Sequence, residues 1–253
     1  EHMVAEISPV KGKILDCCCG LGYAAILSSN FESVEIVDTY EIDKNAIKIS
    51  QHNYQNIEHM GDVTTADFTQ YKDFDLLIGG SPCTYWSICQ SKDKRETTSS
   101  GLGWDLFSQY LRALKEIKPK YFLYENNKSM SKDIKNEITK RLRVEPVYIN
   151  SNLVSAQNRP RLYWTNIPNV EVPKDRNILL KDVVDFSENE FREMSNWVHG
   201  KRGGKLRLDR LATVNSKKAN CLTTSKTHNE QYYANADKTL YTNLSVKQYE
   251  LLQ

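Results

Sequence analysis

A candidate nucleophile in the sequence is the thiol of Cys83, which ends the segment GGSPC at residues 79–83. A short apolar run at residues 74–78 precedes it and is typical of a buried strand. Two glycines clear space and a proline fixes the chain direction, so we expect the thiol to be presented at the strand end. A thiol is ionised to only a few per cent at neutral pH, but its thiolate is a strong nucleophile. The segment therefore predicts a nucleophilic cysteine.

A glycine turn at residues 20–22 follows the apolar run at residues 13–17. Glycines let the backbone approach a ligand closely, and the amides that begin a helix favour negative charge. Glu41 ends the next apolar run, where a carboxylate can bind two hydroxyls of a ribose. The segment from Gly20 to Ala25 also fits the looser dinucleotide fingerprint. The pattern predicts a nucleoside cofactor, either NAD or S-adenosylmethionine.

Two further segments carry groups that could bind or move protons. Glu125 follows the apolar run at residues 121–124, where a carboxyl serves either as a cap or as a proton-handling group with a raised pKa. Gln157 precedes Arg159 and Arg161, just ahead of an expected strand. Guanidinium groups suit phosphate or carbonyl oxygens, although arginines taken by themselves more often form surface ion pairs.

The elements that would position these groups alternate between strands and helices. Strands are expected at residues 13–17, 34–40, 74–78, 121–124 and 162–165, and helices at the glycine turn through Ile26 and at 43–54, 104–117 and 133–142. The helix at 104–117 has apolar residues at Leu106, Tyr110, Leu111, Leu114 and Ile117. Residues 89–103 are polar and are expected to form a long mobile loop.

Such alternation predicts an α/β domain with a mostly parallel sheet and helices on both faces. In these sheets the ligand binds at the carboxyl ends of the strands. Those ends carry Asp16, Glu41, Cys83 and Glu125, with Asp62 in a nearby turn. Their convergence predicts an active site at this edge.

Composition excludes several classes of protein. The chain has 253 residues with a net charge of +2, and no apolar run approaches the roughly 18 residues of a membrane span. The first residues lack a basic start followed by an apolar stretch, so no export signal is expected. The six cysteines and five histidines show no zinc spacing. We expect a soluble cytoplasmic protein with reduced thiols, no metal and no membrane contact.

In this order, the segments resemble the DNA (cytosine-5) methyltransferase family of bacterial or phage type, with a Ser-Pro-Cys catalytic segment. The resemblance covers residues 11–167 and 219–253, and GGSPC at 79–83 and QNRPR at 157–161 are its most specific parts. It implies a Rossmann-like, S-adenosylmethionine-dependent methyltransferase domain, as in restriction–modification systems. Its partner would be double-stranded DNA, which implies association with the nucleoid in a bacterial or phage-infected cell.

The resemblance also implies roles for individual residues. Cys83 would attack carbon 6 of a cytosine flipped out of the duplex, Glu125 would hold the ring nitrogen and the exocyclic amine, and Arg161, supported by Arg159, would bind the carbonyl oxygen. The methyl group would then pass to carbon 5, which loses its proton as Cys83 is eliminated. The implied cofactor-binding residues are Asp16, Cys18, Gly20, Gly22, Glu41, Ile42, Asp62 and Pro82. The implied DNA-binding residues are Ser87, Gln157, Lys201, Arg202, Lys205 and Arg207.

Three parts of the chain are expected. Residues 1–167 would form the catalytic and cofactor-binding domain, 168–216 the target recognition region, and 217–253 a segment returning toward the catalytic domain. A local charge of +6 marks residues 200–218, where Lys201, Arg202, Lys205, Arg207, Arg210, Lys217 and Lys218 face only Asp209. Such a run is usually a solvated surface, but the resemblance favours contact with DNA phosphates. The loop at 84–103 would close over the DNA.

The sequence departs from the family pattern at several positions. Cys18 stands where an aromatic residue is usual, Tyr23 where a second glycine is common, Thr84 in place of glutamine and Asn127 in place of valine. The chain stops at Gln253, before a Gly-Asn-containing segment that completes the cofactor pocket in the family. A trimmed C-terminal segment or a partner chain is therefore expected to complete that pocket.

Other functions compete with this interpretation. One alternative is a catalytically silent DNA-binding or regulatory relative that needs a partner to supply the missing segment, although it would leave Cys83, Glu125 and Arg161 without a role. An NAD-dependent oxidoreductase would explain the glycine turn alone. An RNA substrate is a weaker alternative, because the segment after Cys83 lacks the signature of the tRNA-directed branch.

Overall fold

The computed structural model describes residues 12–17, 34–53, 57–193, 198–199, 204–205, 211–221 and 232–252. The chain divides into two compact units. The first unit comprises Glu1–Ile149 and Arg161–Val172, and the second comprises Asn150–Pro160 and Pro173–Gln253. The expected functional division at residues 167 and 216 stays a prediction.

The first unit is built on a seven-stranded sheet with the order β3-β2-β1-β4-β5-β7-β6. Its strands are β1 (Gly12–Cys17), β2 (Val34–Tyr40), β3 (Ile57–His59), β4 (Leu76–Gly79), β5 (Tyr121–Asn127), β6 (Val147–Asn150) and β7 (Pro160–Thr165). Strands β3, β2, β1, β4 and β5 pair in parallel, whereas β7 runs antiparallel to β5. The expected mostly parallel α/β sheet is confirmed.

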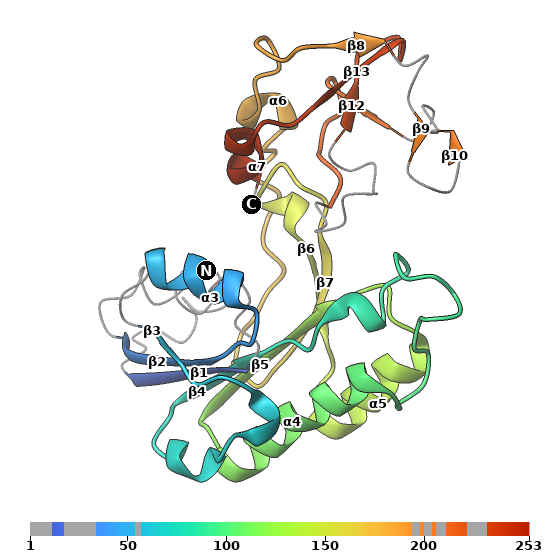
Figure 1. The fold of residues 1–253 in the computed structure, drawn as a ribbon. Coiled ribbons are helices and arrows are strands. Elements are labelled where there is room, and N and C mark those ends of the chain that lie inside the picture. The colour runs from blue at the N-terminus through green and yellow to red at the C-terminus, as the bar shows by residue number, and fades with distance from the viewer. Residues whose placement is uncertain are drawn as a thin grey trace. The chain divides into compact units, whose positions relative to one another are not determined.

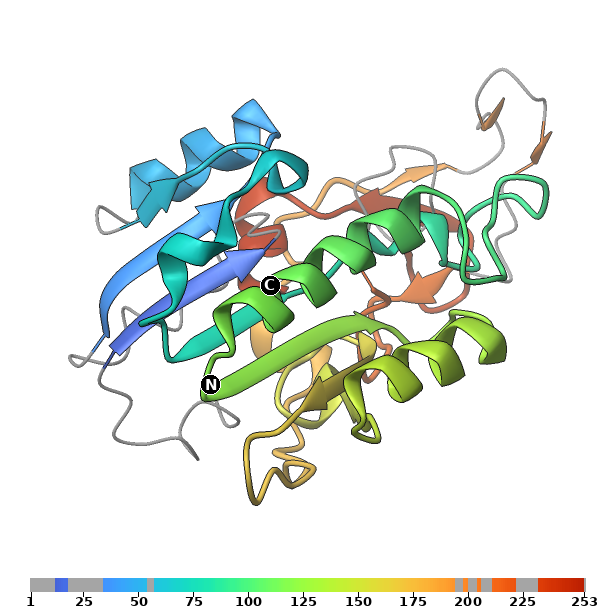
Figure 2. The ribbon, with the colours of Figure 1, turned by 90° about the horizontal axis from the view of Figure 1, so that it is seen from below.

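Helices cover both faces of this sheet (Figures 1 and 2). Helices α4 (Leu102–Ile117) and α5 (Lys132–Leu142) lie on one face, and α3 (Lys44–Asn53) lies on the other. Serine at position 131 caps α5, because its side chain accepts a hydrogen bond from the Ile134 amide. The bounds of α3, α4 and α5 agree closely with the helices expected at residues 43–54, 104–117 and 133–142.

The core forms two apolar layers because neighbouring residues of a strand point to opposite faces. Toward α4 and α5, Leu15 and Leu77 pack with Phe107 and Ile134. On the other face lies a smaller cluster made by Ile14, Val37, Ile57, Leu76, Ile78, Leu123 and Ile167. Strands buried on both faces explain the continuous apolar runs of the sequence.

Three local expectations need correction. Strand β5 extends to Asn127, so Glu125 lies inside the strand rather than after it, because the antiparallel partner β7 continues the ladder to the Asn127–Arg161 pair. The three-residue strand β3 was not expected, since it contains no apolar run. In α4 the buried residues are Gly103, Phe107, Tyr110, Ala113 and Ile117, while Leu106, Leu111 and Leu114 are only partly buried. The helix expected after the glycine turn lies outside the described residues.

The second unit contains two short helices, α6 (Leu180–Val183) and α7 (Val246–Leu252). A four-stranded sheet has the order β11 (Ala212–Thr213), β12 (Tyr232–Ala234), β13 (Leu240–Asn243) and β8 (Arg192–Glu193), and β9 (Val198–His199) pairs with β10 (Gly204–Lys205). Its core consists of Ala156, Leu180, Val184, Ala219, Tyr233, Leu244 and Leu252. Residues 217–253, expected to return toward the catalytic domain, thus supply β12, β13 and α7 to this unit.

Two features are absent from the part of the chain that the structure describes. None of the helices found there has the length and apolar character needed to cross a bilayer. The same residues contain no group of three or more His, Cys, Asp or Glu side chains able to hold a metal ion.

Candidate active site

The segment that leads to Cys83 runs in close contact with its neighbours. A Cβ atom on Gly79 would lie 2.6 Å from the Tyr110 ring, and one on Gly80 would lie 2.8 Å from the carbonyl oxygen of Glu125. Only glycine fits at either position without displacing them, which explains the glycine pair physically. The chain then turns through Pro82 into the 3-10 helix η3 (Cys83–Tyr85), where Cys83 is half-buried.

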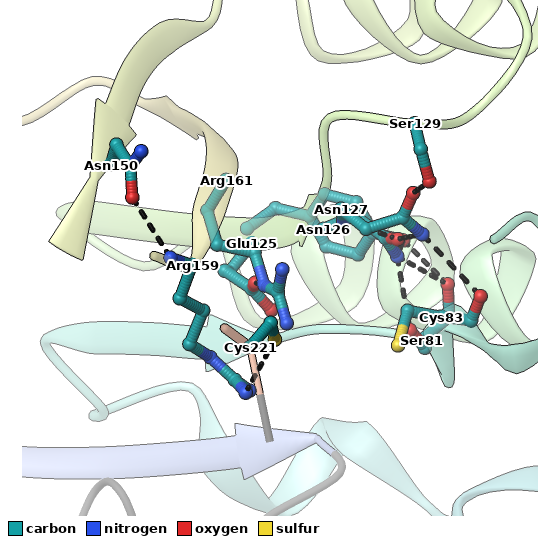
Figure 3. A network of polar contacts seen from close by, with 11 residues as sticks. Ser81, Cys83, Glu125, Asn126, Asn127, Ser129, Asn150, Arg159, Arg161 and Cys221 are labelled. Atoms are coloured by element: carbon teal, nitrogen blue, oxygen red, sulfur yellow. Dashed lines mark hydrogen bonds and ion pairs between the residues drawn. The ribbon is translucent and has the colours of Figure 1, made fainter. Parts of the chain in front are cut away.

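Buried polar groups fix this segment to β5 (Figure 3). The Ser81 hydroxyl lies 2.6 Å from the Tyr124 hydroxyl, and the Asn126 side-chain amide donates to the Ser81 carbonyl at 3.0 Å. Asn126 is fully buried, and its amide also lies within 3.3 Å of both hydroxyls. Satisfied networks of this kind are rigid in a low-dielectric interior. The segment that leads to Cys83 is therefore held in one place.

An ion pair joins the two other predicted catalytic groups of the first unit. The Arg161 Nε lies 2.5 Å from the Glu125 Oε1, and the two residues are diagonal neighbours on β5 and β7. The Arg161 side chain is 10% exposed, whereas that of Glu125 is 38% exposed. A carboxyl and a guanidinium in contact offer donors and acceptors to the edge of a planar heterocycle. The structure thus brings Glu125, Arg161 and the segment of Cys83 together.

Residues predicted to bind a nucleoside lie at the ends of β2 and β3, which pair through Thr39 and His59. One oxygen of Glu41 accepts from the amides of Ile42 and Asp43, each at 2.8 Å. The neighbouring Ile42 side chain is 71% exposed, which gives the base of a nucleoside an apolar surface.

Asp62 follows β3 and forms a local turn. Its Oδ1 accepts from the amide and the hydroxyl of Thr64, both at 2.8 Å, and these bonds lower the pKa of the Asp62 carboxyl. An ionised carboxylate can accept a hydrogen bond from an exocyclic amine. The acceptor oxygens of Glu41 and Asp62 and the apolar surface of Ile42 together fit a nucleoside cofactor.

The other residues predicted to bind the cofactor lie in different parts of the first unit. Asp16 is buried in the middle of the sheet at 3% exposure, and Pro82 precedes η3. Cys18, Gly20 and Gly22 lie outside the described residues. The roles of all of these residues stay predictions.

Most of the predicted DNA contacts belong to the second unit. Gln157 is only 4% exposed, and its main chain is bridged to Ala219. The Arg159 amide donates to the Asn150 side chain at 2.8 Å, and its Nη1 lies 3.8 Å from the Cys221 sulfur (Figure 3). Pro160 ends this segment, so the QNRPR motif crosses from the second unit into the first just before Arg161.

The other residues predicted to contact DNA are Ser87, Lys201, Arg202, Lys205 and Arg207. Ser87 lies in the first unit, where its hydroxyl accepts from the Cys89 amide at 3.1 Å. Lys201, Arg202 and Arg207 lie outside the described residues, and only the backbone of Lys205 is described. These assignments stay predictions.

Lys218 belongs to the basic run but is used inside the second unit. Its ammonium donates to the carbonyls of Asn152 and Ile178 at 2.6 Å and to that of Ser155 at 3.1 Å. Its three hydrogens are thereby directed at backbone oxygens of this unit rather than at phosphates. Lys218 thus tethers the segment that carries Gln157.

Replacing Lys218 with methionine is expected to destabilise the protein by about 2–3 kcal/mol, because three carbonyls lose a charged donor. Thermal unfolding should show this as a midpoint lower by several degrees. The matched control is Lys217→Met, since the Lys217 side chain is exposed and should leave the midpoint unchanged. Equal midpoints for the two variants would contradict the assignment.

Sequence reasoning missed two buried residues that support the segment leading to Cys83, namely Tyr124 and Asn126. A signal was available, because alternate residues of a strand share a face and Tyr124 and Asn126 are two residues apart. The bonding of Lys218 left no such signal, because its partners are backbone carbonyls far away in the sequence.

This chain is similar in sequence to several known methyltransferases. A model of the C-5 cytosine-specific DNA methylase family matches residues 12–252. The orphan methyltransferase M.Rho11sI of Bacillus phage rho11s is 29% identical over 201 residues, which cover 73% of this chain and 39% of the relative. M.SPRI of Bacillus phage SPR, also an orphan methyltransferase, is 32% identical over 170 residues, covering 62% and 38%. The type II methyltransferase M1.ScrFI of Lactococcus lactis subsp. cremoris is 35% identical over 136 residues, covering 49% and 32%.

The chain therefore spans less than two fifths of the length of these relatives. A solved structure described as a DNA modification methyltransferase encoded within a prophage (E. coli) matches with a TM-score of 0.54 and 17% identity. That match covers 72% of this chain and 60% of the other, and it shows the fold. The extent of the family match decides the relationship: this chain belongs to the C-5 cytosine-specific DNA methylase family.

Proposed function

We propose that this protein transfers a methyl group from S-adenosylmethionine to carbon 5 of cytosine in double-stranded DNA. The observation that carries the proposal is the Glu125–Arg161 ion pair in contact with the glycine segment that presents Cys83. Family membership agrees with this chemistry, and it leaves the NAD-dependent oxidoreductase without support.

Cys83 is the nucleophile of the proposed reaction. Its thiolate forms a bond to carbon 6 of the flipped-out cytosine, and the electrons of the 5,6 double bond move toward carbon 5 and the ring nitrogen. After the methyl group has been added, a base removes the proton from carbon 5. The electrons of that bond restore the double bond and expel the Cys83 thiolate.

Glu125 and Arg161 hold the ring during these steps. The Glu125 carboxyl binds the ring nitrogen and exocyclic amine, which stabilises the protonated ring as carbon 6 is attacked. Arg161 donates to the ring carbonyl oxygen while its Nε keeps Glu125 oriented. The pair therefore recognises cytosine and also favours addition of the thiolate.

Three residues would hold the cofactor. Glu41 would bind its ribose, Ile42 would pack against the face of its base, and Asp62 would bind its exocyclic amine. Bound S-adenosylmethionine supplies an electrophilic methyl group. The chain's own contribution is to fix the nucleoside, through carboxylates that stand at the ends of two paired strands.

Asparagine in place of Asp62 should raise the KM for S-adenosylmethionine about tenfold while kcat changes little, because one charge-assisted hydrogen bond is lost. Initial rates at varied cofactor concentration measure this. Asp67→Asn is a close control, since Asp67 caps η2 (Phe68–Tyr71) through Thr69 in the way that Asp62 caps η1 (Val63–Thr65) through Thr64. A similar KM increase in both variants would show a loss of turn structure only.

We assign the target recognition region to residues 168–216. The basic residues at 200–218, apart from the internally bonded Lys218, would contact DNA phosphates. A DNA substrate places the protein inside a bacterial or phage-infected cell. The matched phage orphan and type II enzymes suggest either solitary modification or restriction–modification as its setting.

The test is incubation of the protein with labelled S-adenosylmethionine and mixed-sequence duplex DNA, followed by nucleoside analysis. The expected result is label in 5-methylcytosine, and mapping the modified sites gives the recognised sequence. Label in an exocyclic amino group of cytosine or adenine, or in RNA alone, would overturn the proposal. Duplex binding without any transfer would identify a catalytically silent relative.

A further inference from the structure

The end of β5 contacts the turn of Cys83 from a side that the proposed chemistry does not use. The Asn127 side-chain amide donates to the Cys83 carbonyl at 3.4 Å and to the Asn126 side-chain oxygen at 3.1 Å (Figure 3). Asn127 is only 5% exposed, so its amide groups depend on protein partners. These contacts connect Asn127 directly to the backbone of the nucleophile.

Ser129 orients Asn127 and extends the contact along the loop. Its hydroxyl donates to the Asn127 side-chain oxygen at 2.6 Å and accepts from the Ile88 amide at 3.3 Å. With its oxygen engaged in this way, the Asn127 side chain must direct its NH₂ group toward Cys83 and Asn126. The amide orientation is thus set by Ser129.

Arg95, which lies within the loop, completes the arrangement. Its Nε donates to the Trp86 carbonyl at 3.2 Å, and its Nη2 donates to the Ser129 carbonyl. A single guanidinium therefore joins the residues after Cys83 to the segment after β5. We call this set of three residues the loop anchor: Asn127, Ser129 and Arg95.

The neighbouring Glu96 shows that the long loop is docked as well. Its carboxylate accepts from the Trp86 indole at 3.1 Å and from the Gly103 amide at 3.1 Å, and Trp86 is fully buried. Glu96 thus joins the middle of the loop at residues 89–103 to Trp86 before it and to Gly103 at its end, and the expected mobility of this loop stays a prediction. The reactive turn and the loop are therefore supported as one unit.

We propose that Asn127 is a positioning residue for Cys83 and that Ser129 and Arg95 keep it in place. The loop anchor fixes the carbonyl of Cys83 and the main chain at Trp86 and Ile88, and so limits where the sulfur can lie relative to Glu125 and Arg161. This inference rests on the proposed function and assigns it a further residue. A small displacement of a nucleophile is enough to reduce turnover strongly.

The kinetic test is Asn127→Val, which removes the amide and keeps a side chain of comparable size. We expect kcat to fall about 10- to 100-fold while the KM values for DNA and cofactor stay within about twofold. Ser129→Ala should cause a smaller fall, and the double variant should lose less than the two effects combined, since both act through one network. Lys128→Ala, an exposed residue between them, should retain the wild-type kcat.

A second readout does not require methyl transfer. Alkylation of Cys83 by iodoacetamide, followed by peptide mass spectrometry with Cys221 as the internal reference, should be several-fold faster in Asn127→Val because the half-buried thiol is released. Unchanged alkylation would overturn the loop anchor, and faster alkylation with an unchanged kcat would overturn the positioning role. If the wild type transfers no methyl group, the proposed function fails, but the alkylation result still decides whether the loop anchor exists.

Discussion

Serine in place of Cys83 is expected to lower kcat by roughly 10⁴-fold or more, the scale seen when an enzyme loses its nucleophile. A serine hydroxyl ionises far less readily than a thiol, so almost no oxyanion is present at neutral pH to attack carbon 6. The substitution replaces one atom and preserves the shape of the turn. Labelled methyl transfer to duplex DNA measures the loss.

The neighbouring Cys89 provides a matched control for this prediction. It lies six residues further along the chain and is exposed, so Cys89→Ser changes the same pair of atoms outside the reactive turn. We expect Cys89→Ser to keep full activity and Cys83→Ser to keep duplex binding. Transfer that survives in Cys83→Ser would exclude a covalent mechanism through this thiol.

Binding should survive in Cys83→Ser because the segment is not held by the sulfur alone. Ser81 is fixed to Tyr124 and Asn126, and the Cys83 carbonyl receives the Asn127 amide. These bonds involve backbone and neighbouring side chains that serine leaves unchanged. The variant therefore separates chemistry from recognition.

The sheet could be predicted well because its strands are buried on both faces. Such strands are rich in apolar residues, and the strand expected at 34–40 coincides with β2. The positions of Cys83 and Glu41 after their strands follow from the same runs. Local sequence was sufficient where burial alone determines structure.

Local sequence was insufficient where a distant partner decides the outcome. Glu125 lies within β5 because β7 pairs with that strand, although about 40 residues of chain separate them. The residues around Glu125 contain no pattern that predicts this pairing. Asn127 was identified only as an unusual residue, since its role depends on Ser129 and on the Cys83 carbonyl. In both cases the missing information was tertiary.

The second large effect is expected from Glu125→Gln, which should lower kcat about 10²- to 10⁴-fold, the range of general acid–base contributions. Glutamine has the same shape, and its oxygen can still accept from the Arg161 guanidinium. It cannot, however, take up or supply a proton at the ring nitrogen. The fold and the KM for the cofactor should therefore be preserved, and single-turnover methyl transfer would report the defect.

The control for Glu125→Gln is Glu137→Gln, which alters another glutamate paired to an arginine, Arg141, on the surface of α5. It should leave turnover unchanged, because exposed ion pairs contribute little. Arg161→Lys complements the pair, since lysine keeps the charge but lacks the planar fork that reaches both Glu125 and a base. If Arg161→Lys impaired turnover while Glu125→Gln remained within threefold of wild type, the carboxyl would serve only to orient Arg161. Recognition of the cytosine would then depend on the guanidinium, and the proton at the ring nitrogen would have to come from another group.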